Sequence, residues 1–458
     1  MLHFDFIDAR HPNGTARHIG DVHPFWHKGK LYLYYLSTDG SFSSRLATTT
    51  DFFRFTGEEL RQAAPAPAIG TYYVLGVTPY GGSFVSYFGA SDTAVNGSFS
   101  EDLTNWRGLR GPAVPNIHYR SGRDPYLFFD PEAARWRIVY TAYRSNRKDG
   151  GDFDAALSLL TSRTEKLEDG WEEEERELVR FDNAGLSRRE DPECSQMMKL
   201  GDRWYLFYSV YSRTVHGVGG LSYRAGEAGL ALTENDWERL PEHSLDGEDL
   251  CAAQVFSMEG KTCLLGWIPQ TADADDWGGA LSFPREVYPL PGGALGLRLP
   301  EFIREALRGE TVYELPAPVR GTEKYAEQLL CAAEGPILLE AGLEAGEGSR
   351  WGLAFRGREE YSVTWDGGLH ISGYDRIARP RASCPAPGAG EMALTLVLDG
   401  DIMEVFLNGR YALAARLGGG REAEKRAVSF FSQGQCLLKE LKIYRPDKEI
   451  CAKWEETY

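Results

Sequence analysis

Three acidic residues, Asp21, Asp124 and Glu193, recur at intervals of about 70 to 100 residues, each near an aromatic, strand-like run. Two carboxylates on either side of a glycosidic bond are the minimal machinery for hydrolysing it. Glu193 also precedes the apolar pair Met197 and Met198, and an acid held against apolar surface has a raised pKa, as a general acid near neutral pH requires. Singly, each acid is typical of a turn. Their similar placement is what indicates a site.

The elements that position these acids form a weak repeat. Aromatic, alternating runs that predict strands lie at 28–36, 84–90, 135–142, 203–209 and 261–268. Their spacing of roughly 50 to 70 residues suits one propeller blade each, and no convincing amphipathic helix separates them. We therefore predict a five-bladed β-propeller over residues 1–299, with a β-sandwich or barrel array as the alternative that spacing leaves open. The inner strands of a propeller converge on its axis, so acids from different blades meet there.

The pattern changes after residue 299. Residues 300–308 have helical spacing, and we expect a linker with a short helix over 300–320. Short alternating strands follow, among them 394–399 and 403–407, and the second ends in an Asn-Gly turn typical of a hairpin. These features predict a β-sandwich domain over 321–458. The expected fold class is thus all-β, a propeller followed by a C-terminal sandwich.

Composition narrows the classes of function. The chain has 458 residues and a net charge of −17, which argues against nucleic acid or an anionic membrane as a partner. Aromatic residues make up 12% of the chain, which favours a β-rich protein that stacks the apolar faces of a sugar. No membrane span or secretory signal is evident, so we expect a cytoplasmic protein, although a secreted chain trimmed of its signal would look the same.

Cysteine usage also favours a cytoplasmic protein. Seven cysteines lie far apart, and no pair has CxxC spacing. The pattern indicates neither a zinc site nor a disulfide framework, and it fits reduced thiols. We expect no metal and no cofactor.

The order of motifs along nearly the whole chain resembles glycoside hydrolase family 32, which contains invertases, levanases and inulinases. The matching segments are Arg123-Asp124-Pro125, Glu193-Cys194, residues 249–256 and 266–268, the Trp277 to Glu286 segment (Trp-Gly-Gly-Ala-Leu-Ser-Phe-Pro-Arg-Glu), and Met403-Glu404-Val405-Phe406-Leu407-Asn408. The resemblance implies a five-bladed propeller followed by a sandwich, and a retaining enzyme that releases fructose from β-fructofuranosides such as sucrose, fructo-oligosaccharides, levan or inulin.

The sequence departs from this family at the nucleophile. The usual Trp-Met-Asn-Asp-Pro-Asn-Gly motif is missing, and Asp21 in Gly-Asp-Val-His-Pro stands in its place. The segment His11-Pro12-Asn13-Gly14 copies the end of the motif but has His where the acid belongs. Gly20 and Leu36 replace the Asn and Gln of the family, which weakens the set of residues expected to bind the hydroxyls of a terminal fructose.

By this resemblance, Asp21 is the nucleophile that forms a covalent fructosyl-enzyme, and Glu193 is the acid and then the base. Retention expects the two carboxyl groups roughly 5 to 5.5 Å apart. Asp124 would hold furanose hydroxyls and stabilise the cationic transition state. Cys194 is expected to pack rather than react. The side chains expected to bind substrate are those of Arg123, which would keep Asp124 ionised, His23 and Trp277.

Other functions stay open from the sequence. An inverting arabinosidase or xylosidase of glycoside hydrolase family 43 would share the propeller and three acids. A sugar-binding protein without catalysis would tolerate a divergent nucleophile motif, although binding alone does not require all three acids. Fructosyl transfer to a second sugar is also open. In every case we expect an oligo- or polysaccharide as the ligand, and formation of a homodimer is left open.

Overall fold

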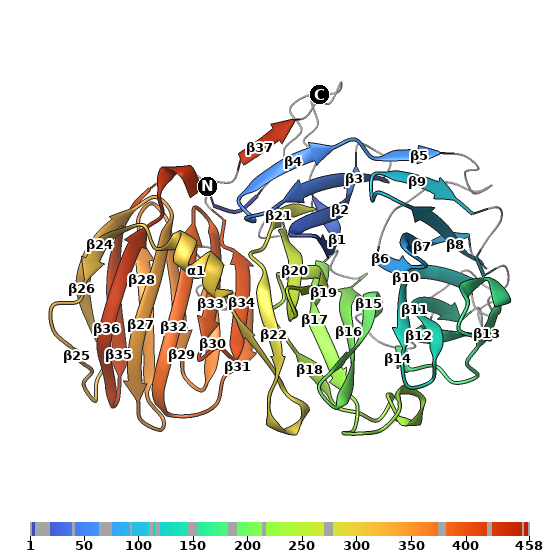
Figure 1. Ribbon diagram of the computed structural model, residues 1–458. Helices are drawn as coiled ribbons and strands as arrows, with labels where there is room; N and C mark the ends of the chain where they lie inside the picture. The colour runs from blue at the N-terminus through green and yellow to red at the C-terminus, as the bar shows by residue number, and fades with distance from the viewer. Residues whose placement is uncertain are drawn as a thin grey trace.

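The computed structural model describes most of the chain. The described residues are 2–4, 19–38, 42–63, 76–91, 94–109, 113–114, 120–144, 154–181, 190–212, 217–269, 278–373, 382–418, 424–450 and 453–456. They fold mainly into strands, and Figure 1 shows two parts side by side, a ring of sheets and a two-layered sandwich.

Five sheets within the described residues lie before Leu299. The first contains β1 (Gly20–His27), β2 (Lys30–Thr38), β3 (Phe42–Thr49), β4 (Arg54–Glu58) and, from the other end of the chain, β37 (Lys453–Glu456). The second contains β5 (Arg61–Ala63), β6 (Val77–Tyr80), β7 (Ser83–Ser91), β8 (Ala94–Ser100) and β9 (Asn105–Gly108).

The remaining three sheets follow in chain order. The third contains β10 (Arg120–Asp130), β11 (Arg135–Arg144), β12 (Asp154–Ser162), β13 (Trp171–Glu173) and β14 (Val179–Phe181), with the short helix η1 (Leu167–Asp169). The fourth contains β15 (Glu190–Leu200), β16 (Arg203–Ser212), β17 (Gly217–Ala225) and β18 (Glu242–Ser244), with η2 (Leu232–Glu234). The fifth contains β19 (Cys251–Met258), β20 (Lys261–Pro269), β21 (Gly279–Leu281), β22 (Arg285–Pro289) and β23 (Leu295–Arg298), with η3 (Pro291–Gly293).

These sheets surround a common centre, so the predicted β-propeller is confirmed as the fold of this part (Figure 1). Tight hairpins build several of them. Lys28 and Gly29 join β1 to β2 with φ of 49° and 76°, and Glu259 and Gly260 join β19 to β20 with φ of 49° and 77°. Positive φ at both loop residues is the turn geometry that matches the twist of paired strands.

A second type of turn recurs: it joins β3 to β4 in the first sheet and β8 to β9 in the second sheet. In one, the Asp51 carboxylate accepts the backbone N–H groups of Phe53 and Arg54, each at 2.8 Å. In the other, the Asp102 carboxylate accepts those of Thr104 and Asn105, at 3.0 and 2.7 Å. This hydrogen-bonded turn therefore recurs in the first two sheets.

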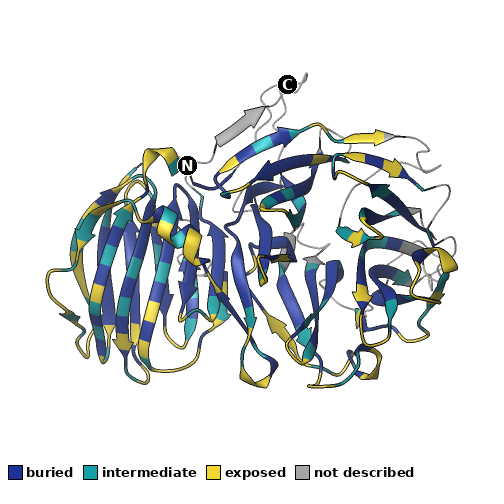
Figure 2. Ribbon diagram, in the orientation of Figure 1, coloured by how far each residue is buried: buried dark blue, intermediate teal, exposed yellow. Residues whose placement is uncertain are grey.

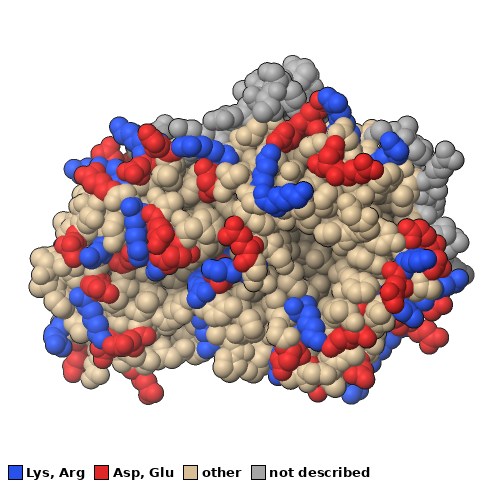
Figure 3. Space-filling view, viewed as in Figure 1, with Lys and Arg blue, Asp and Glu red and all other residues tan. Residues whose placement is uncertain are grey.

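An axial cavity of about 440 Å³ lies where the first strands of the sheets converge. Residues of β1, β6, β10, β15 and β19 all line it. Figure 3 shows the molecule hollowed near the centre of the ring, with acidic and basic side chains intermixed on the surrounding surface.

The second part is a sandwich of two sheets, which confirms the predicted second fold. One sheet contains β24 (Glu310–Glu314), β25 (Val319–Arg320), β36 (Cys436–Arg445), β27 (Ile337–Ala345), β32 (Gly390–Asp399), β33 (Ile402–Leu407) and β34 (Tyr411–Arg416). The other contains β26 (Ala326–Glu334), β35 (Lys425–Gln433), β28 (Arg350–Arg356), β29 (Glu360–Trp365), β30 (Gly368–Ser372) and β31 (Ala382–Pro385). The short helix η5 (Lys448–Ile450) follows β36.

The structure divides the chain differently from the predicted ranges at two points. The short helix expected in 300–320 is α1 (Glu301–Leu307), but β24 and β25 pair with β36 and so belong to the sandwich sheet rather than to a linker. Near the other end, β37 leaves the sandwich and pairs in parallel with β4 of the propeller. These three strands are short and pair with partners that are distant in the sequence, so local sequence patterns do not reveal the pairing.

The two parts share a buried interface with charged residues at its centre, which we call the interdomain clamp and define as His3, Asp246, Arg285, Asp399 and Glu404. The His3 imidazole lies 3.0 Å from Asp399 and 2.8 Å from Glu404. Arg285 lies 2.7 Å from Glu404 and 3.0 Å from Asp246. Figure 2 shows buried residues on both sides of this boundary, in the sandwich strands and in β22 and β20. Among the described residues, no helix is long and apolar enough to cross a membrane.

Candidate active site

The first strand in four of the propeller sheets has the same irregularity. The pairing of β1, β10, β15 and β19 with the next strand shifts register near the start of the strand, after Gly20, Arg123, Glu193 and Cys251, and β10 has a further shift between Arg120 and Arg123. Immediately after the shift begins, one non-glycine residue takes a positive φ. These residues are Asp21 (44°), Asp124 (51°), Cys194 (51°) and Ala252 (42°). Each is a β-bulge, which re-aims side chains at a strand end and is common beside active sites.

The repeated bulge explains how the three acids come together. Asp21 and Asp124 occupy the bulge position itself, whereas Glu193 lies one residue before it and Cys194 takes that position. The sequence predicts the acids just ahead of aromatic strands. The structure shows that they lie inside the first strand of each sheet, and that the aromatic runs are second strands such as β2, β11 and β16.

One cation lies among the acids. The Arg123 guanidinium is 3.0 Å from a Glu193 oxygen and 3.9 Å from an oxygen of Asp124. A backbone N–H, that of Cys194, donates to Asp124 at 3.0 Å, so the third and fourth sheets are linked at this point. The side chains of Arg123, Asp124 and Glu193 keep 34%, 22% and 21% of their surface exposed, so a ligand can reach all three.

Electrostatics raise the pKa values of both candidate catalytic acids. Burial, together with the charge of Asp124, raises the pKa of Asp21 to about 7, against the opposing effects of Arg123 and a hydrogen bond from Trp267. Burial raises the pKa of Glu193 to about 8; Arg123 opposes this rise, and the nearby carboxylates Asp124, Asp21 and Asp191 add to it. Like charges in a desolvated site are costly and mark functional sites.

An apolar cluster supplies the desolvation. Cys194, Cys251, Ala252 and Trp267 are all buried and pack against one another beside the acids. Burial also raises the pKa of the Cys194 thiol well above its usual value, so this residue stays protonated and packs, as expected. Within the described residues, no group of three or more His, Cys, Asp or Glu side chains is arranged to hold a metal ion.

The structure describes two of the three residues predicted to bind substrate. Arg123 lies at the acids. His23 lines the axial cavity, where burial lowers its pKa to about 4 and so keeps it neutral. Among the described residues, no group hydrogen-bonds to its buried Nδ1 atom. Trp277 lies outside the described residues.

Sequence reasoning missed three residues at this site. Trp267 reaches Asp21 from β20, and Tyr143 and Asp191 contact Arg123. Only Asp191, in the run Glu190-Asp191-Pro192-Glu193, gave a signal, because it stands two residues from Glu193 and so on the same side of a strand.

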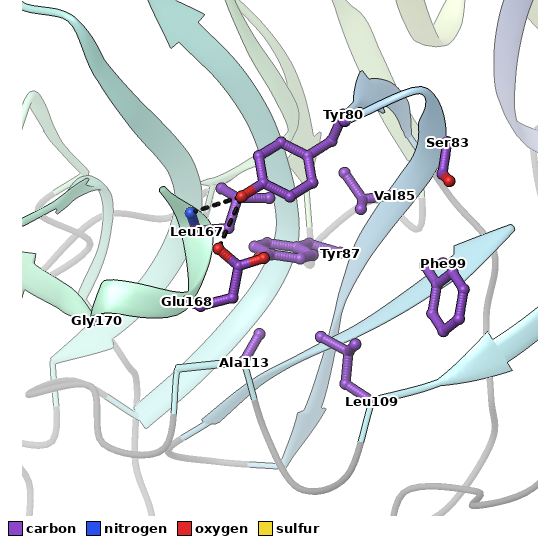
Figure 4. A pocket seen from close by; sticks show the side chains of 11 residues that line it. Tyr80, Ser83, Val85, Tyr87, Phe99, Leu109, Ala113, Leu167, Glu168 and Gly170 are labelled. Atoms are coloured by element: carbon purple, nitrogen blue, oxygen red, sulfur yellow. Dashed lines mark hydrogen bonds between the residues drawn. The ribbon is translucent and has the colours of Figure 1, made fainter. Parts of the chain in front are cut away.

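A second pocket offers a contrast. It has a volume of about 410 Å³ and lies between the second sheet and η1, walled by Tyr80, Val85, Tyr87 and Phe99 (Figure 4). Its acid is Glu168, which accepts a hydrogen bond from the Tyr80 hydroxyl at 2.7 Å. The described lining provides no second carboxylate, so this pocket lacks the pair that glycoside hydrolysis requires.

The fold and this site define a β-propeller protein with a cluster of acids at one end of its axis. Comparison with models of known protein families finds no match. A sequence comparison finds sucrose-6-phosphate hydrolase of Escherichia coli, 27% identical over 273 residues, which are 54% of this chain and 53% of that protein. The chain thus matches about half the length of this curated relative.

Solved structures resemble nearly the whole chain. A fructofuranosidase from Schwanniomyces occidentalis, in complex with fructose, aligns over 97% of both chains with a TM-score of 0.67 and 14% identity. Sucrose-6-phosphate hydrolase from Lactobacillus gasseri aligns over 96% of this chain and 93% of that one (TM-score 0.66, 14% identity). Fructan 1-exohydrolase IIa from Cichorium intybus aligns over 96% and 98% (TM-score 0.67, 15% identity). The chain therefore has the fold of these fructofuranosidase, sucrose-6-phosphate hydrolase and fructan exohydrolase structures.

Proposed function

We propose that this protein is a retaining glycoside hydrolase that releases fructose from β-fructofuranosides. The observation that carries the proposal is the pair of carboxylates, Asp21 and Glu193, whose pKa values are raised by the same site to about 7 and about 8. Proteins similar in sequence or fold include sucrose-6-phosphate hydrolases and fructofuranosidases, which supports a fructoside as the substrate.

In the first step, the ionised Asp21 carboxylate attacks the anomeric carbon of the fructosyl unit while Glu193 gives its proton to the leaving oxygen. The glycosidic bond breaks, and a bond from Asp21 to the anomeric carbon forms. In the second step, ionised Glu193 takes a proton from water, and the water oxygen displaces Asp21. Asp124, beside Arg123, holds hydroxyls of the sugar and stabilises the positive charge of the transition state.

The raised pKa values suit these roles, because near neutral pH such a pair can supply one ionised and one protonated carboxyl group. We expect a bell-shaped dependence of kcat/KM on pH, with an ascending limb near 7 and a descending limb near 8, which report the coupled pair rather than single residues. Stopped assays of fructose release across pH 5 to 10 would measure both limbs.

The experiment that tests the function is sugar release from sucrose, sucrose 6-phosphate, kestose, inulin and levan by the wild type, Asp21→Asn and Glu193→Gln. Release of fructose by the wild type, lost in both variants, would support the proposal. Formation of longer fructosides at high sucrose would show transfer in addition to hydrolysis.

Two results would contradict it. Cleavage of aryl arabinosides or xylosides, without action on any fructoside, would assign the site to a family 43 type of reaction. Binding of fructosides without turnover, measured by calorimetry, would leave a sugar-binding protein. The anomer that is formed first, followed by NMR, distinguishes retention from inversion.

A further inference from the structure

A fourth carboxylate, that of Asp191, lies behind the proposed acid Glu193. The two residues are two positions apart on β15, before the register shift, so their side chains lie on the same side of the strand. Only 1% of the Asp191 side chain is exposed, against 21% for Glu193. Asp191 is therefore too deeply buried to meet a substrate, but it shares the surroundings of the residue that does.

The link between the two acids is Arg123. One nitrogen of its guanidinium, Nη2, lies 3.0 Å from a Glu193 oxygen and 3.9 Å from an Asp191 oxygen. The Tyr143 ring supports this arrangement, because Arg123 stacks over it at 5.2 Å and its hydroxyl donates to Asp191 at 3.2 Å. One cation thus faces two carboxylates of the same strand.

The backbone of β15 is held in place at the same point. The Thr141 hydroxyl on β11 donates to the carbonyl of Pro192, between the two acids, at 2.8 Å. β11 thus contributes both Thr141, which fixes the strand, and Tyr143, which fixes the Asp191 carboxylate. Asp191, on the fourth sheet, is therefore held in position by two residues of the third sheet.

The charges that face Glu193 come from three of the sheets. Asp21 lies on β1, Asp124 and Arg123 on β10, and Asp191 on β15, and Tyr143 on β11 faces Arg123. Arg123 is the cation among them that favours the ionised form of Glu193, and Asp191 opposes that effect. A guanidinium paired with Glu193 alone would draw the proton off the acid before substrate arrives.

We propose that Asp191 is a positioning residue that holds part of the charge of Arg123 away from Glu193, so that Glu193 keeps its proton until the leaving oxygen takes it. This inference rests on the proposed function, in which Glu193 is the general acid. Asp191 touches no reacting atom and acts through Arg123.

The first test is the pH dependence of fructose release by Asp191→Asn. The substitution keeps the shape of the side chain and an oxygen that accepts from Tyr143, but it removes the charge. We expect the descending limb to move about one pH unit lower, so that at pH 9 the activity relative to the maximum falls about tenfold below that of the wild type. KM and the activity at the optimum change little by comparison.

Asp130→Asn is the matched control. Asp130 is also a buried acid, on β10, and it pairs at 2.8 Å with Arg137, away from Glu193. Asp130→Asn should lower the melting temperature without moving the descending limb of the pH profile. If Asp191→Asn does not fold, Asp191→Ser removes the same charge and still offers an oxygen to Tyr143. A descending limb that stays in place or moves higher in a folded Asp191 variant would overturn the proposal.

A second measurement separates this inference from the proposed function. The Glu193 carboxyl can be titrated by NMR with ¹³C-labelled glutamate, and its signal is identified by its loss in Glu193→Gln. A lower midpoint in Asp191→Asn, but not in Asp130→Asn, supports the role of Asp191 even if the wild type releases no fructose. An unchanged midpoint overturns it, whatever the activity.

Discussion

Two clusters of carboxylates and cations among the described residues, the interdomain clamp and the candidate active site, are built in opposite ways. In the interdomain clamp, burial favours the neutral acids, but hydrogen bonds and charge from His3 lower the pKa of Asp399 to about 2, and Arg285 with His3 lowers that of Glu404. Asp246 is the exception, because burial there outweighs Arg285 and raises its pKa. In the candidate active site, four carboxylates face one Arg123, and the pKa values of Asp21 and Glu193 rise.

The difference lies in how many partners each oxygen has. Asp399 accepts backbone N–H groups of Leu2 and His3 at 2.7 and 2.8 Å in addition to the imidazole. Glu404 accepts the N–H of Phe283 at 2.8 Å in addition to His3 and Arg285. Several donors lower the pKa values of Asp399 and Glu404. In the candidate active site the acids outnumber their donors, so Asp21 and Glu193 can hold protons that are transferred. We therefore expect the interdomain clamp to contribute to stability and the candidate active site to catalysis.

The largest expected effect is the loss of activity when Glu193 in the candidate active site is replaced. Glu193→Gln should lower kcat for fructose release about 10³-fold, because general acid catalysis contributes factors of this order. The same change should not lower the melting temperature, since it removes one of several like charges. Assays of kcat with thermal unfolding followed by circular dichroism test both statements. A large loss of stability would show that Glu193 is structural, as the clamp residues are.

The next largest effect is on stability. Glu404→Gln removes the shared partner of Arg285 and His3, and breaking a buried ion pair on one side costs about 3 to 5 kcal/mol. Urea unfolding measures this loss. Glu314→Gln is the control, because the pair of Glu314 with Lys442 lies on the surface. A loss no larger than that of the control would show that the clamp does not contribute to folding.

A smaller effect depends on pH. Burial alone would lower the pKa of His3, but hydrogen bonds and charge from Asp399 and Glu404 raise it above 6.5. The stability contributed by protonated His3 is therefore complete below about pH 6.5 and is lost as pH rises through its pKa in the folded state. His3→Gln should be less stable than the wild type by about 1.5 to 3 kcal/mol at pH 6, and the difference should shrink at higher pH.

Urea unfolding at pH 6, 7, 8 and 9 gives this difference, with His243→Gln as an exposed control. The comparison with wild type cancels the titration of the active-site acids. A difference between His3→Gln and wild type that is constant across this range would show that His3 is not charged in the clamp.

The smallest effect concerns Cys194. The thiol is buried and protonated, and it occupies a bulge position rather than a reacting one. Cys194→Ser should change kcat less than tenfold, and thiol reagents should not inactivate the folded protein. Rapid inactivation by iodoacetamide, prevented by substrate, would contradict this assignment.

Sequence reasoning located the fold and the acids because both depend on local patterns. Alternating aromatic runs recur once per sheet, and the acids stand at fixed places before them. The bulges were not predictable, because positive φ at Asp21, Cys194 and Ala252 has no glycine to signal it. Trp267 and Tyr143 were missed since their roles depend on the packing of different sheets. β37 was assigned to the sandwich because nothing within its four residues specifies β4 as a partner.

The clamp and β37 together have a consequence for the path of the chain. Residues 2–4 run from β21, where the Leu281 N–H bonds to the Phe4 carbonyl at 2.8 Å, to Asp399 in the sandwich. Past the sandwich, the chain returns to β4. Segments near both ends of the sequence therefore connect the propeller and the sandwich, in addition to the connection through α1. Because these segments also hold the two parts together, the propeller and the sandwich should unfold as one cooperative unit. A cut in α1 should leave the two parts joined.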